Sequence, residues 1–459
     1  MLGIADKGFA QSWLYFHAHN SSRFSAIFLP QRQFASQPNS VKFNLAWSAL
    51  FILRCSHMIT FSDIEQSRAR IHKQIYLSPF AYSETISRTT DSRVFFKLEN
   101  LQMTGSFKER GALNRLLTLA PHEAKRGVVA ASAGNHGMAV AFHSQKLKRS
   151  ATIVMPLHAP LIKVSRVRLY GGECVLHGSD YDSAFAEARR LSRERGLSFI
   201  HAFDDPWVVA GQGTIGLELY EQNPALEAVV VPIGGGGLIA GIALALKTLN
   251  PRIRVIGVQA EAIPSMQAAL ASGKPTRLPP STTIADGIAV RMVGELALAL
   301  AQRYVDEVVT VTEGEIANAV LLLLEIEKTV AEGAAAVPLA ALVNKKVVLK
   351  GKNVGLVVSG GNIDMNLISR IIEKGLIQDG RLTRFSIVIY DRPGTLAQIA
   401  QRIAETGANI LHISQTRGFG QMAIGETEVE LVLETTGPEQ IERIHRTLRK
   451  HKFKVKNGS

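Results

Sequence analysis

The chain has 459 residues, of which 46% are hydrophobic and 20% are charged, and its formal net charge at pH 7 is +13. The length predicts two or three domains, and the composition argues against a disordered chain and against a membrane protein. The basic excess is scattered and not interleaved with aromatic residues, which argues against a nucleic-acid-binding groove. Two cysteines, Cys55 and Cys174, are too few for a disulfide framework, so we expect a reducing compartment, the cytoplasm.

Residues 1–57 differ from the rest of the chain, because they are poor in acidic residues and rich in Ser, Phe and Gln. Their apolar stretch at 41–53 is too short to span a bilayer. A transit-like presequence, a signal segment and an extension from an upstream start are three explanations, of which we favour the last. After Met58, Ser62 and Glu65 have the spacing of a capping box at the start of a helix, as a folded N-terminus would.

From about residue 94, short apolar runs alternate with longer helical patterns, which predicts a doubly wound α/β structure. The runs are apolar along their whole length, as parallel strands buried on both faces are. The predicted strands are 93–98, 127–132, 150–156, 228–234, 253–260 and 354–361. Ligands in such sheets bind beyond the carboxyl ends of the strands, so the following loops are the expected site.

One lysine, Lys108, has unusual neighbours. It follows Phe107 in "MTGSFKERGA", at the start of a helical pattern that includes Gly111 and Ala112. A lysine exposed to solvent does not require an aromatic residue and small residues beside it. We therefore expect Lys108 to face a ligand.

The first strand-end loop reads "ASAGNHG". Ser132, Gly134 and Asn135 leave backbone N–H groups free at a helix start, which suits a carboxylate. The Asn135 amide could also bond a phenolic oxygen. An ordinary glycine turn explains this loop equally well when it is considered alone.

The second loop has four consecutive glycines, Gly234, Gly235, Gly236 and Gly237, between a buried strand and an apolar helix. Without Cβ atoms, several N–H groups can converge on one phosphate. No acidic residue follows where a dinucleotide ribose would need one, and no Lys-Ser/Thr pair follows as in a P-loop. The apolar flanks argue against a flexible linker.

The third loop begins at Ser359, followed by Gly360, Gly361 and a helix led by Asp364. A lone hydroxyl here is usually a helix cap. In company with a phosphate seat and a sheltered amine, however, it suits pyridoxal phosphate held by a lysine as a Schiff base.

In this order, "SFKERGA", "SAGNHG", "GGGG" and "SGGN" resemble the motifs of the fold-type II pyridoxal-phosphate enzymes, over about residues 58–380. The segments "FDDPWVVAGQGTIGLE" and "TIADGIAV" are similar to the threonine dehydratase (threonine ammonia-lyase) branch. The resemblance implies a catalytic domain over 58–380, like the tryptophan synthase β subunit, with two parallel-sheet subdomains, the smaller at roughly 100–205. It also implies pyridoxal 5'-phosphate as cofactor.

The resemblance implies a role for each motif residue. Lys108 would carry the cofactor and take the substrate's Cα proton, and its burial would lower its pKa. The other implied cofactor contacts are Phe107 beside the ring, Asn135 at the phenolic oxygen, Gly234 to Gly237 at the phosphate, Glu332 near the cofactor and Ser359 at the pyridine nitrogen. The implied substrate-carboxylate contacts are the N–H groups of Ser132, Ala133, Gly134 and Asn135. An alternative for Glu332 is a partly exposed charge at a helix start.

Two substitutions separate this chain from the serine racemases of the same family. Ala133 stands where racemases have a second serine that serves as the opposite-face acid, so racemisation is not expected. Glu261 is followed six residues later by Gln267, where racemase-like members have a second acid, so no metal site is predicted. His143 and His201 are expected to be packed, hydrogen-bonded histidines.

In residues 381–459 the order of predicted elements changes to βαββαβ, which is the topology of the split-βαβ fold. The segment "DRPGTLAQIAQRIAETGANI" resembles an ACT domain, an amino-acid-sensing module. Such domains commonly pair edge to edge, so we expect a homo-oligomer, a dimer or tetramer, with an amino-acid effector between subunits. The candidate effector residues are Pro393, Gly394, Asn409 and Ile410. An alternative is that the domain only holds the oligomer together.

The sequence therefore predicts an enzyme that deaminates L-threonine to 2-oxobutanoate and ammonia, with L-serine as a secondary substrate. This reaction would belong to isoleucine biosynthesis or to threonine catabolism. Alternatives are an L-serine dehydratase or a β-replacement synthase of the same fold, and a non-catalytic amino-acid sensor.

Overall fold

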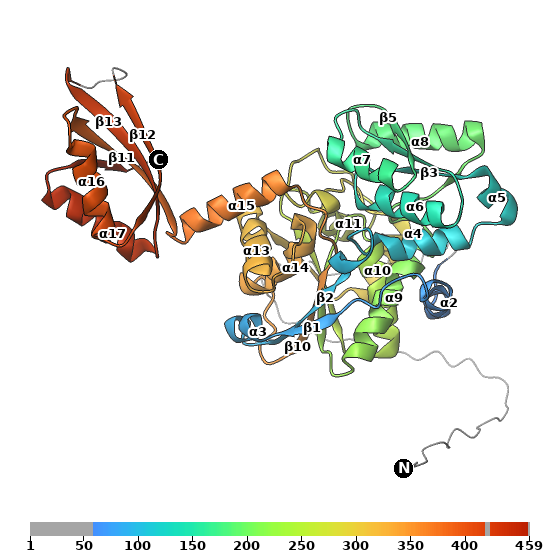
Figure 1. The fold of residues 1–459 in the computed structure, drawn as a ribbon. Helices are drawn as coiled ribbons and strands as arrows, with labels where there is room; N and C mark the ends of the chain where they lie inside the picture. The colour runs from blue at the N-terminus through green and yellow to red at the C-terminus, as the bar shows by residue number, and fades with distance from the viewer. Residues whose placement is uncertain (1–57, 418–422, 458–459) are drawn as a thin grey trace, which may run out of the picture. The chain divides into compact units, whose positions relative to one another are not determined.

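A computed structural model describes residues 58–417 and 423–457. The prediction for residues 1–57 lies outside the described residues. Within them, no helix is both long enough and apolar enough to cross a membrane. The described chain forms two parallel-sheet units, followed by a third unit with an antiparallel sheet (Figure 1).

The larger sheet has six strands, in the order β1-β2-β10-β7-β8-β9. Its strands are β1 (Phe80–Ser83), β2 (Arg93–Leu98), β7 (Ala228–Pro232), β8 (Arg254–Ala260), β9 (Glu307–Val311) and β10 (Asn353–Val358). The pair β1 and β2 is antiparallel, and the other four pairs are parallel. In the central strand β7, Val230 packs on one side of the sheet, and Val229 and Val231 pack on the other. Burial on both faces explains why the central strands are apolar along their length.

Helices cover both faces of the larger sheet (Figure 1). The helices of this unit are α2 (Phe61–Ile71), α3 (Glu84–Thr90), η1 (Glu99–Leu101), α9 (Pro206–Gln222), α10 (Gly237–Leu249), α11 (Ser265–Ser272), η2 (Asp286–Ile288), α12 (Glu295–Tyr304), α13 (Glu313–Glu325), α14 (Gly333–Val343) and α15 (Met365–Gln378). One face packs against α9, α10, α11 and α12, and the other against α3, α13 and α14.

The smaller sheet has four strands, all parallel, in the order β5-β4-β3-β6. Its strands are β3 (Val128–Ala131), β4 (Ala151–Met155), β5 (Glu173–Leu176) and β6 (Ser198–Phe199), and the associated helices are α4 (Lys108–Leu117), α5 (Pro121–Arg126), α6 (Asn135–Lys146), α7 (Leu161–Leu169) and α8 (Tyr181–Arg195). Helices α6 and α7 pack on one face of this sheet and α8 packs on the other.

The C-terminal unit has the order β11 (Leu382–Tyr390), α16 (Thr395–Ala404), β12 (Asn409–Arg417), β13 (Glu426–Glu434), α17 (Pro438–Lys450) and β14 (Lys454–Asn457). Its antiparallel sheet has the strand order β12-β13-β11-β14. Alternate residues of β13, such as Val429 and Leu431, are buried beneath α16 and α17, whereas Glu428 and Glu430 lie on the opposite face. The βαββαβ prediction is confirmed.

The six predicted strands are confirmed as β2, β3, β4, β7, β8 and β10. The four strands that the sequence did not predict, β1, β5, β6 and β9, all lie at sheet edges. An edge strand is not buried on both faces and therefore lacks a continuous apolar run.

The capping box predicted at Ser62 and Glu65 is wrong, because α2 begins earlier. Thr60 is the N-cap: its side chain accepts a hydrogen bond from the Asp63 N–H, and the Asp63 carboxylate accepts one from the Thr60 N–H at 2.8 Å. Thr and Asp form this reciprocal pair as Ser and Glu can.

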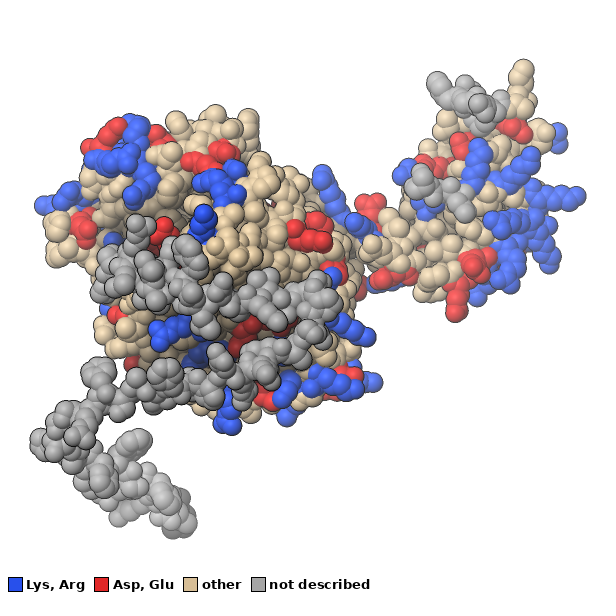
Figure 2. All heavy atoms as spheres, turned by 180° about the vertical axis from the view of Figure 1, so that it is seen from behind, with Lys and Arg blue, Asp and Glu red and all other residues tan. Residues whose placement is uncertain are grey.

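Charged side chains are distributed differently over the units. In the view of Figure 2, basic and acidic residues are interspersed over the two parallel-sheet units, whereas blue spheres gather along one edge of the C-terminal unit. Exposed basic residues are concentrated there in α17 and β14: Arg443, Arg446, Arg449, Lys450, Lys454 and Lys456.

Candidate active site

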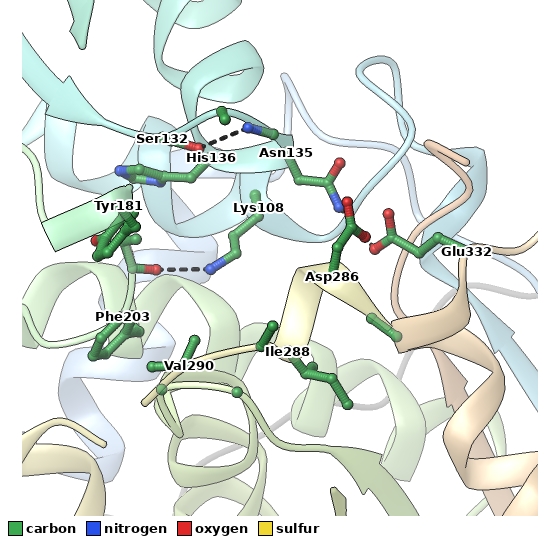
Figure 3. Close-up of a pocket in the computed structure, with 18 of the residues that line it drawn as sticks. Lys108, Ser132, Asn135, His136, Tyr181, Phe203, Asp286, Ile288, Val290 and Glu332 are labelled. Atoms are coloured by element: carbon green, nitrogen blue, oxygen red, sulfur yellow. Dashed lines mark hydrogen bonds between the residues drawn. The ribbon is translucent and has the colours of Figure 1, made fainter. Parts of the chain in front are cut away.

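A cavity of about 1080 Å³ lies at the carboxyl ends of strands from both parallel sheets (Figure 3). The loops after β3, β7 and β10 all line it, as predicted. The structure brings together every predicted cofactor and substrate residue in the walls of this cavity: Phe107, Lys108, Ser132, Ala133, Gly134, Asn135, Gly234, Gly235, Gly236, Gly237, Glu332 and Ser359.

Lys108 is the first residue of α4, and its amine projects into the cavity (Figure 3). Its Nζ donates a hydrogen bond to the Ala202 carbonyl oxygen at 2.9 Å. Burial lowers the pKa of the Lys108 amine from 10.5 to about 8, while the negative charge of Glu332 acts in the opposite direction. A substantial fraction of the amine is therefore neutral near physiological pH, as a base or nucleophile requires.

The segment before Lys108 is fixed against the loop that follows β10. The Phe107 N–H donates to the Ser359 carbonyl oxygen at 3.0 Å, and the Gly361 N–H donates to the Gly105 carbonyl oxygen at 2.9 Å. Ser359 itself is buried. It is not a helix cap, because Asp364 caps α15.

The glycine loop connects β7 to α10. Gly236 has φ +94° and is the N-cap of α10. A Cβ on Gly235 would lie 2.2 Å from the Phe203 ring, and one on Gly237 would lie 2.5 Å from the Phe203 carbonyl oxygen. The chain therefore needs glycine here, and the N–H groups at the start of a buried helix are of the kind that can hold an anion.

The loop after β3 leads into α6, whose first residue is Asn135. The Gly134 N–H donates to Ser132 Oγ at 3.1 Å (Figure 3), so a substrate carboxylate would compete with Ser132 for this donor. A Cβ placed on Gly134 would meet nothing within 4 Å, which shows that the loop is open toward the cavity.

Glu332 precedes α14 and is 4% exposed, so the alternative of a partly exposed helix-start charge is wrong. Its Oε1 accepts a hydrogen bond from Asn135 Nδ2 at 2.8 Å. Burial, reinforced by the Asp286 carboxylate, raises the pKa of Glu332 to about 7. Figure 3 shows the Asp286 and Glu332 side chains directed toward one another.

Three neighbours of these residues were not predicted from the sequence. Asn362 donates to Asn135 Oδ1 at 2.9 Å, and Lys163 of α7 forms an ion pair of 2.6 Å with Asp286, both of which line the cavity. The sequence carried a signal for two of them, because Asn362 ends the "SGGN" motif and Asp286 lies in "TIADGIAV". Lys163 has no such signal.

The sequence analysis also did not predict a buried cluster of charged residues that includes Arg110, two residues after Lys108. Arg110 donates to both oxygens of Glu99 and to both oxygens of Glu218, and Lys97 Nζ donates to Glu218 at 2.6 Å. The fifth guanidinium N–H donates to Thr214 Oγ1, so all five N–H groups of Arg110 are used. The cluster ties α4 to β2, η1 and α9. The sequence contained one indication of this cluster, because Lys97 interrupts the apolar run "RVFFKL".

The two predicted structural histidines are packed and hydrogen-bonded, as expected. His143 is buried, with Nε2 3.2 Å from Glu109 Oε2. His201 Nδ1 accepts from the Asp204 N–H at 2.8 Å. His201 also lines the cavity, and burial lowers its pKa to about 4, which keeps the ring neutral there.

The predicted effector residues do not lie together within one chain. Pro393 and Gly394 precede α16, and Gly394 is its N-cap. Asn409 and Ile410 begin β12, after the other end of the same helix. The ten residues of α16 rise about 15 Å. A single amino acid could therefore contact all four residues only if two chains contribute to the site.

The residues present fit pyridoxal phosphate. The four-glycine cradle, which Cβ atoms would obstruct, matches a phosphate, and the Lys108 amine is the group that would bond an aldehyde. Asn135 uses one N–H for Glu332 and retains a second for a phenolic oxygen. Ser359, at the end of β10, offers a neutral hydroxyl to a ring nitrogen.

Comparison with known proteins agrees with this fit. The family model "Pyridoxal-phosphate dependent enzyme" matches residues 71–360, and the ACT domain model matches residues 383–450. The L-threonine ammonia-lyase of Thermotoga maritima is 48% identical over 391 residues, covering 85% of this chain and 97% of the relative. The L-threonine ammonia-lyase of Geobacter sulfurreducens is 46% identical over 389 residues, covering 84% and 96%.

Comparison with solved structures gives the same family relationship. The processed form of threonine deaminase isoform 2 from Solanum lycopersicum has a TM-score of 0.66 and 37% identity, covering 68% of this chain and 87% of that one. Maize serine racemase has a TM-score of 0.66 and 34% identity, covering 70% and 99%. The chain belongs to the pyridoxal-phosphate dependent enzymes of fold type II and carries a C-terminal ACT domain.

Proposed function

We propose that the protein is an L-threonine ammonia-lyase, which converts L-threonine to 2-oxobutanoate and ammonia and accepts L-serine less well. The observation that carries the proposal is the joint placement of Lys108, the Gly234–Gly237 loop and Ser359 in the walls of one cavity. Its support is the identity of 46–48% with L-threonine ammonia-lyases over most of the chain.

Pyridoxal phosphate supplies an aldehyde that bonds amines and a ring that withdraws electrons from the adjacent carbon. Lys108 would hold the cofactor through its Nζ, and the same atom, when free and neutral, would accept the Cα proton of the substrate. Its lowered pKa leaves the amine neutral often enough to do so.

The N–H groups of the Ser132–Asn135 loop hold the substrate carboxylate at the start of α6. Ala133 has no hydroxyl, so the loop offers no acid at this position to return a proton to Cα from the opposite side. This favours elimination over the racemisation named for the maize relative.

Ser359 influences the type of reaction. A hydroxyl does not hold the ring nitrogen protonated as a carboxylate would, which weakens electron withdrawal and favours prompt loss of the β-hydroxyl. The β-hydroxyl would leave as water, and the product, released when the Lys108 amine takes the cofactor back, would hydrolyse to the 2-oxo acid and ammonia, so that one water is released and one consumed. Phe203, Ile288 and Val290 give the cavity an apolar wall that suits the threonine methyl group.

Initial rates on threonine and serine test the proposal. We expect kcat/KM to be higher for threonine, with equal amounts of 2-oxobutanoate and ammonia. A preference for serine of about tenfold or more would identify an L-serine dehydratase instead. Release of a β-substituted amino acid when a thiol is added would indicate a β-replacement synthase.

We further propose that the protein is a cytoplasmic homo-oligomer and that its ACT domain binds an amino-acid effector between two chains. The separation of Gly394 from Asn409 along α16 supports a site shared by two chains. Rates on threonine measured with each branched-chain amino acid in turn test for an effector. Sedimentation with and without the active amino acid tests whether two chains are needed.

A further inference from the structure

Four side chains that line the cavity form a continuous chain of hydrogen bonds from the half-buried Arg166 to the buried Glu332. Arg166 Nη1 of α7 donates to Asn362 Oδ1 at 2.9 Å, and Asn362 Nδ2 donates to Asn135 Oδ1 at 2.9 Å. Asn135 Nδ2 then donates to Glu332 Oε1 at 2.8 Å. The four residues come from four different segments of the chain.

The direction of this chain is determined by its ends. An arginine can only donate, so the Asn362 atom that it contacts is the carbonyl oxygen. The Asn362 nitrogen also donates to the Thr104 carbonyl oxygen at 2.7 Å, which can only accept. Its remaining N–H therefore requires an acceptor on Asn135, and the Asn135 nitrogen must face Glu332.

Two glycines leave room for the contacts. A Cβ on Gly105, where φ is +77°, would lie 2.9 Å from Asn362 Oδ1. A Cβ on Gly360 would lie 2.6 Å from Glu332 Oε1 and 3.1 Å from Asn135 Nδ2. The distances of 2.9 Å and 2.6 Å are too short for a Cβ contact, and the distance of 3.1 Å is tight, so glycine at both positions leaves space for the three polar side chains.

We infer that Asn362 is a positioning residue, which keeps the Asn135 N–H directed at the cofactor and couples it through Arg166 to helix α7. The inference rests on the proposed contact between Asn135 and the phenolic oxygen of the cofactor. If the Asn135 amide turned over, its oxygen would face the Glu332 carboxylate and its nitrogen the Asn362 nitrogen. The contacts of Asn362 prevent this.

Helix α7 belongs to the smaller-sheet unit, whereas Asn362 follows a strand of the larger sheet. The same helix contributes Lys163, one turn before Arg166, to the ion pair with Asp286. The position of α7 is thereby linked to the hydrogen bonding of the bound cofactor, although Arg166 need not touch the cofactor itself.

The visible absorbance of the cofactor-loaded protein, recorded without substrate, tests the inference. A donor to the phenolic oxygen favours its anionic form. In Asn362→Asp and in Arg166→Met, we expect the ratio of the neutral phenolic band to the anionic band at fixed pH to rise by about threefold or more. Arg166→Lys keeps a donor and should restore most of the wild-type ratio.

Arg168→Met is the matched control, because Arg168 is exposed on the same helix and lies outside the cavity walls. Its spectrum should equal that of the wild type. Asn135→Ala should shift the ratio by itself, and adding Arg166→Met to it should shift the ratio no further. Circular dichroism confirms that each variant is folded.

An unchanged ratio in folded Arg166→Met protein, or an additive shift in the double variant, overturns the inference. If Asn362→Asp does not fold, Arg166→Met and the double variant still decide the question. No substrate is needed, so the result stands apart from the threonine assay: a protein inactive on threonine can still show the expected spectra.

Discussion

Arg110 donates two parallel hydrogen bonds to Glu99, from Nε at 2.8 Å and from Nη2 at 2.7 Å, and both side chains are fully buried. Glu218 and Lys97 complete a cluster with two positive and two negative charges. Because Arg110 is two residues after Lys108, the cluster anchors the start of the helix that carries the reactive amine.

Removal of one charge from this cluster should be costly. Arg110→Met leaves two buried carboxylates with one lysine, and we expect the free energy of unfolding to fall by about 3–5 kcal/mol. Arg254→Met, which breaks the exposed pair with Glu307, should cost less than about 1 kcal/mol. Urea unfolding measured by circular dichroism compares the two. Equal unfolding midpoints for Arg110→Met and the wild type would show that the cluster does not stabilise the fold.

Lys108→Ala should abolish covalent attachment of the cofactor and lower kcat on threonine by at least about 10²-fold, because both the attachment site and the base are lost. Borohydride reduction followed by peptide mass mapping checks the attachment. Among the described residues, Lys163 is the other lysine that lines the cavity, and Lys163→Ala should leave the label on Lys108. A label found on any lysine except Lys108 in the wild type would refute the assignment.

The rate at which pyridoxal phosphate attaches to the cofactor-free protein should depend on pH through Lys108. Its pKa is lowered to about 8, and only the neutral amine attacks a carbonyl, so the rate should rise with pH and level off above a midpoint near 8. Stopped-flow absorbance measures this rate. A midpoint near the ordinary value of 10.5 would mean that burial does not act on Lys108 as proposed.

Glu332→Gln should move the midpoint of the pH dependence of cofactor attachment to lower pH. The Glu332 carboxylate is ionised above its pKa of about 7, and its negative charge raises the pKa of Lys108, so its removal lowers the pKa further. Glu227→Gln is the control, because Glu227 precedes β7 at the end opposite the glycine loop. Its midpoint should match the wild type, and a shift as large as that of Glu332→Gln would point to an unspecific effect.

Gly235→Ala should weaken cofactor binding. The new Cβ would lie 2.2 Å from the Phe203 ring, and an overpacked contact of this kind costs about 1–3 kcal/mol, which is about 5-fold to 150-fold in affinity where the cost falls on binding. Gly314→Ala in α13, where a Cβ meets nothing within 4 Å, should bind the cofactor normally. Fluorescence titration of the cofactor-free proteins gives both dissociation constants, and equal values would argue against a close-fitting loop.

Local patterns in the sequence, and the order in which they follow one another, predicted most of the strands and the loops that form the site. Continuous apolar runs predicted the six central strands, because burial on both faces favours apolar residues. The buried Lys97 in β2 is accommodated because Glu218 pairs with it. The four motifs predicted which loops would line the cavity, because in parallel sheets the carboxyl ends of the strands meet at one edge. Lys108, Asn135, Gly235 and Ser359 all lie there, although their roles are still predictions.

Only the tertiary structure decided which side chains pair. Asn362 contacts Asn135 over 227 residues of sequence, and Arg110 contacts Glu218 over 108. No local pattern encodes such a pair, since each partner has an ordinary place on its own helix or loop. The edge strands escaped prediction because they are not buried on both faces. The Thr60 cap was missed for a local reason, because Thr60 with Asp63 and Ser62 with Glu65 both have capping-box spacing. Periodicity and motif order act over a few residues, whereas hydrogen-bond partners are chosen when separately formed elements pack together.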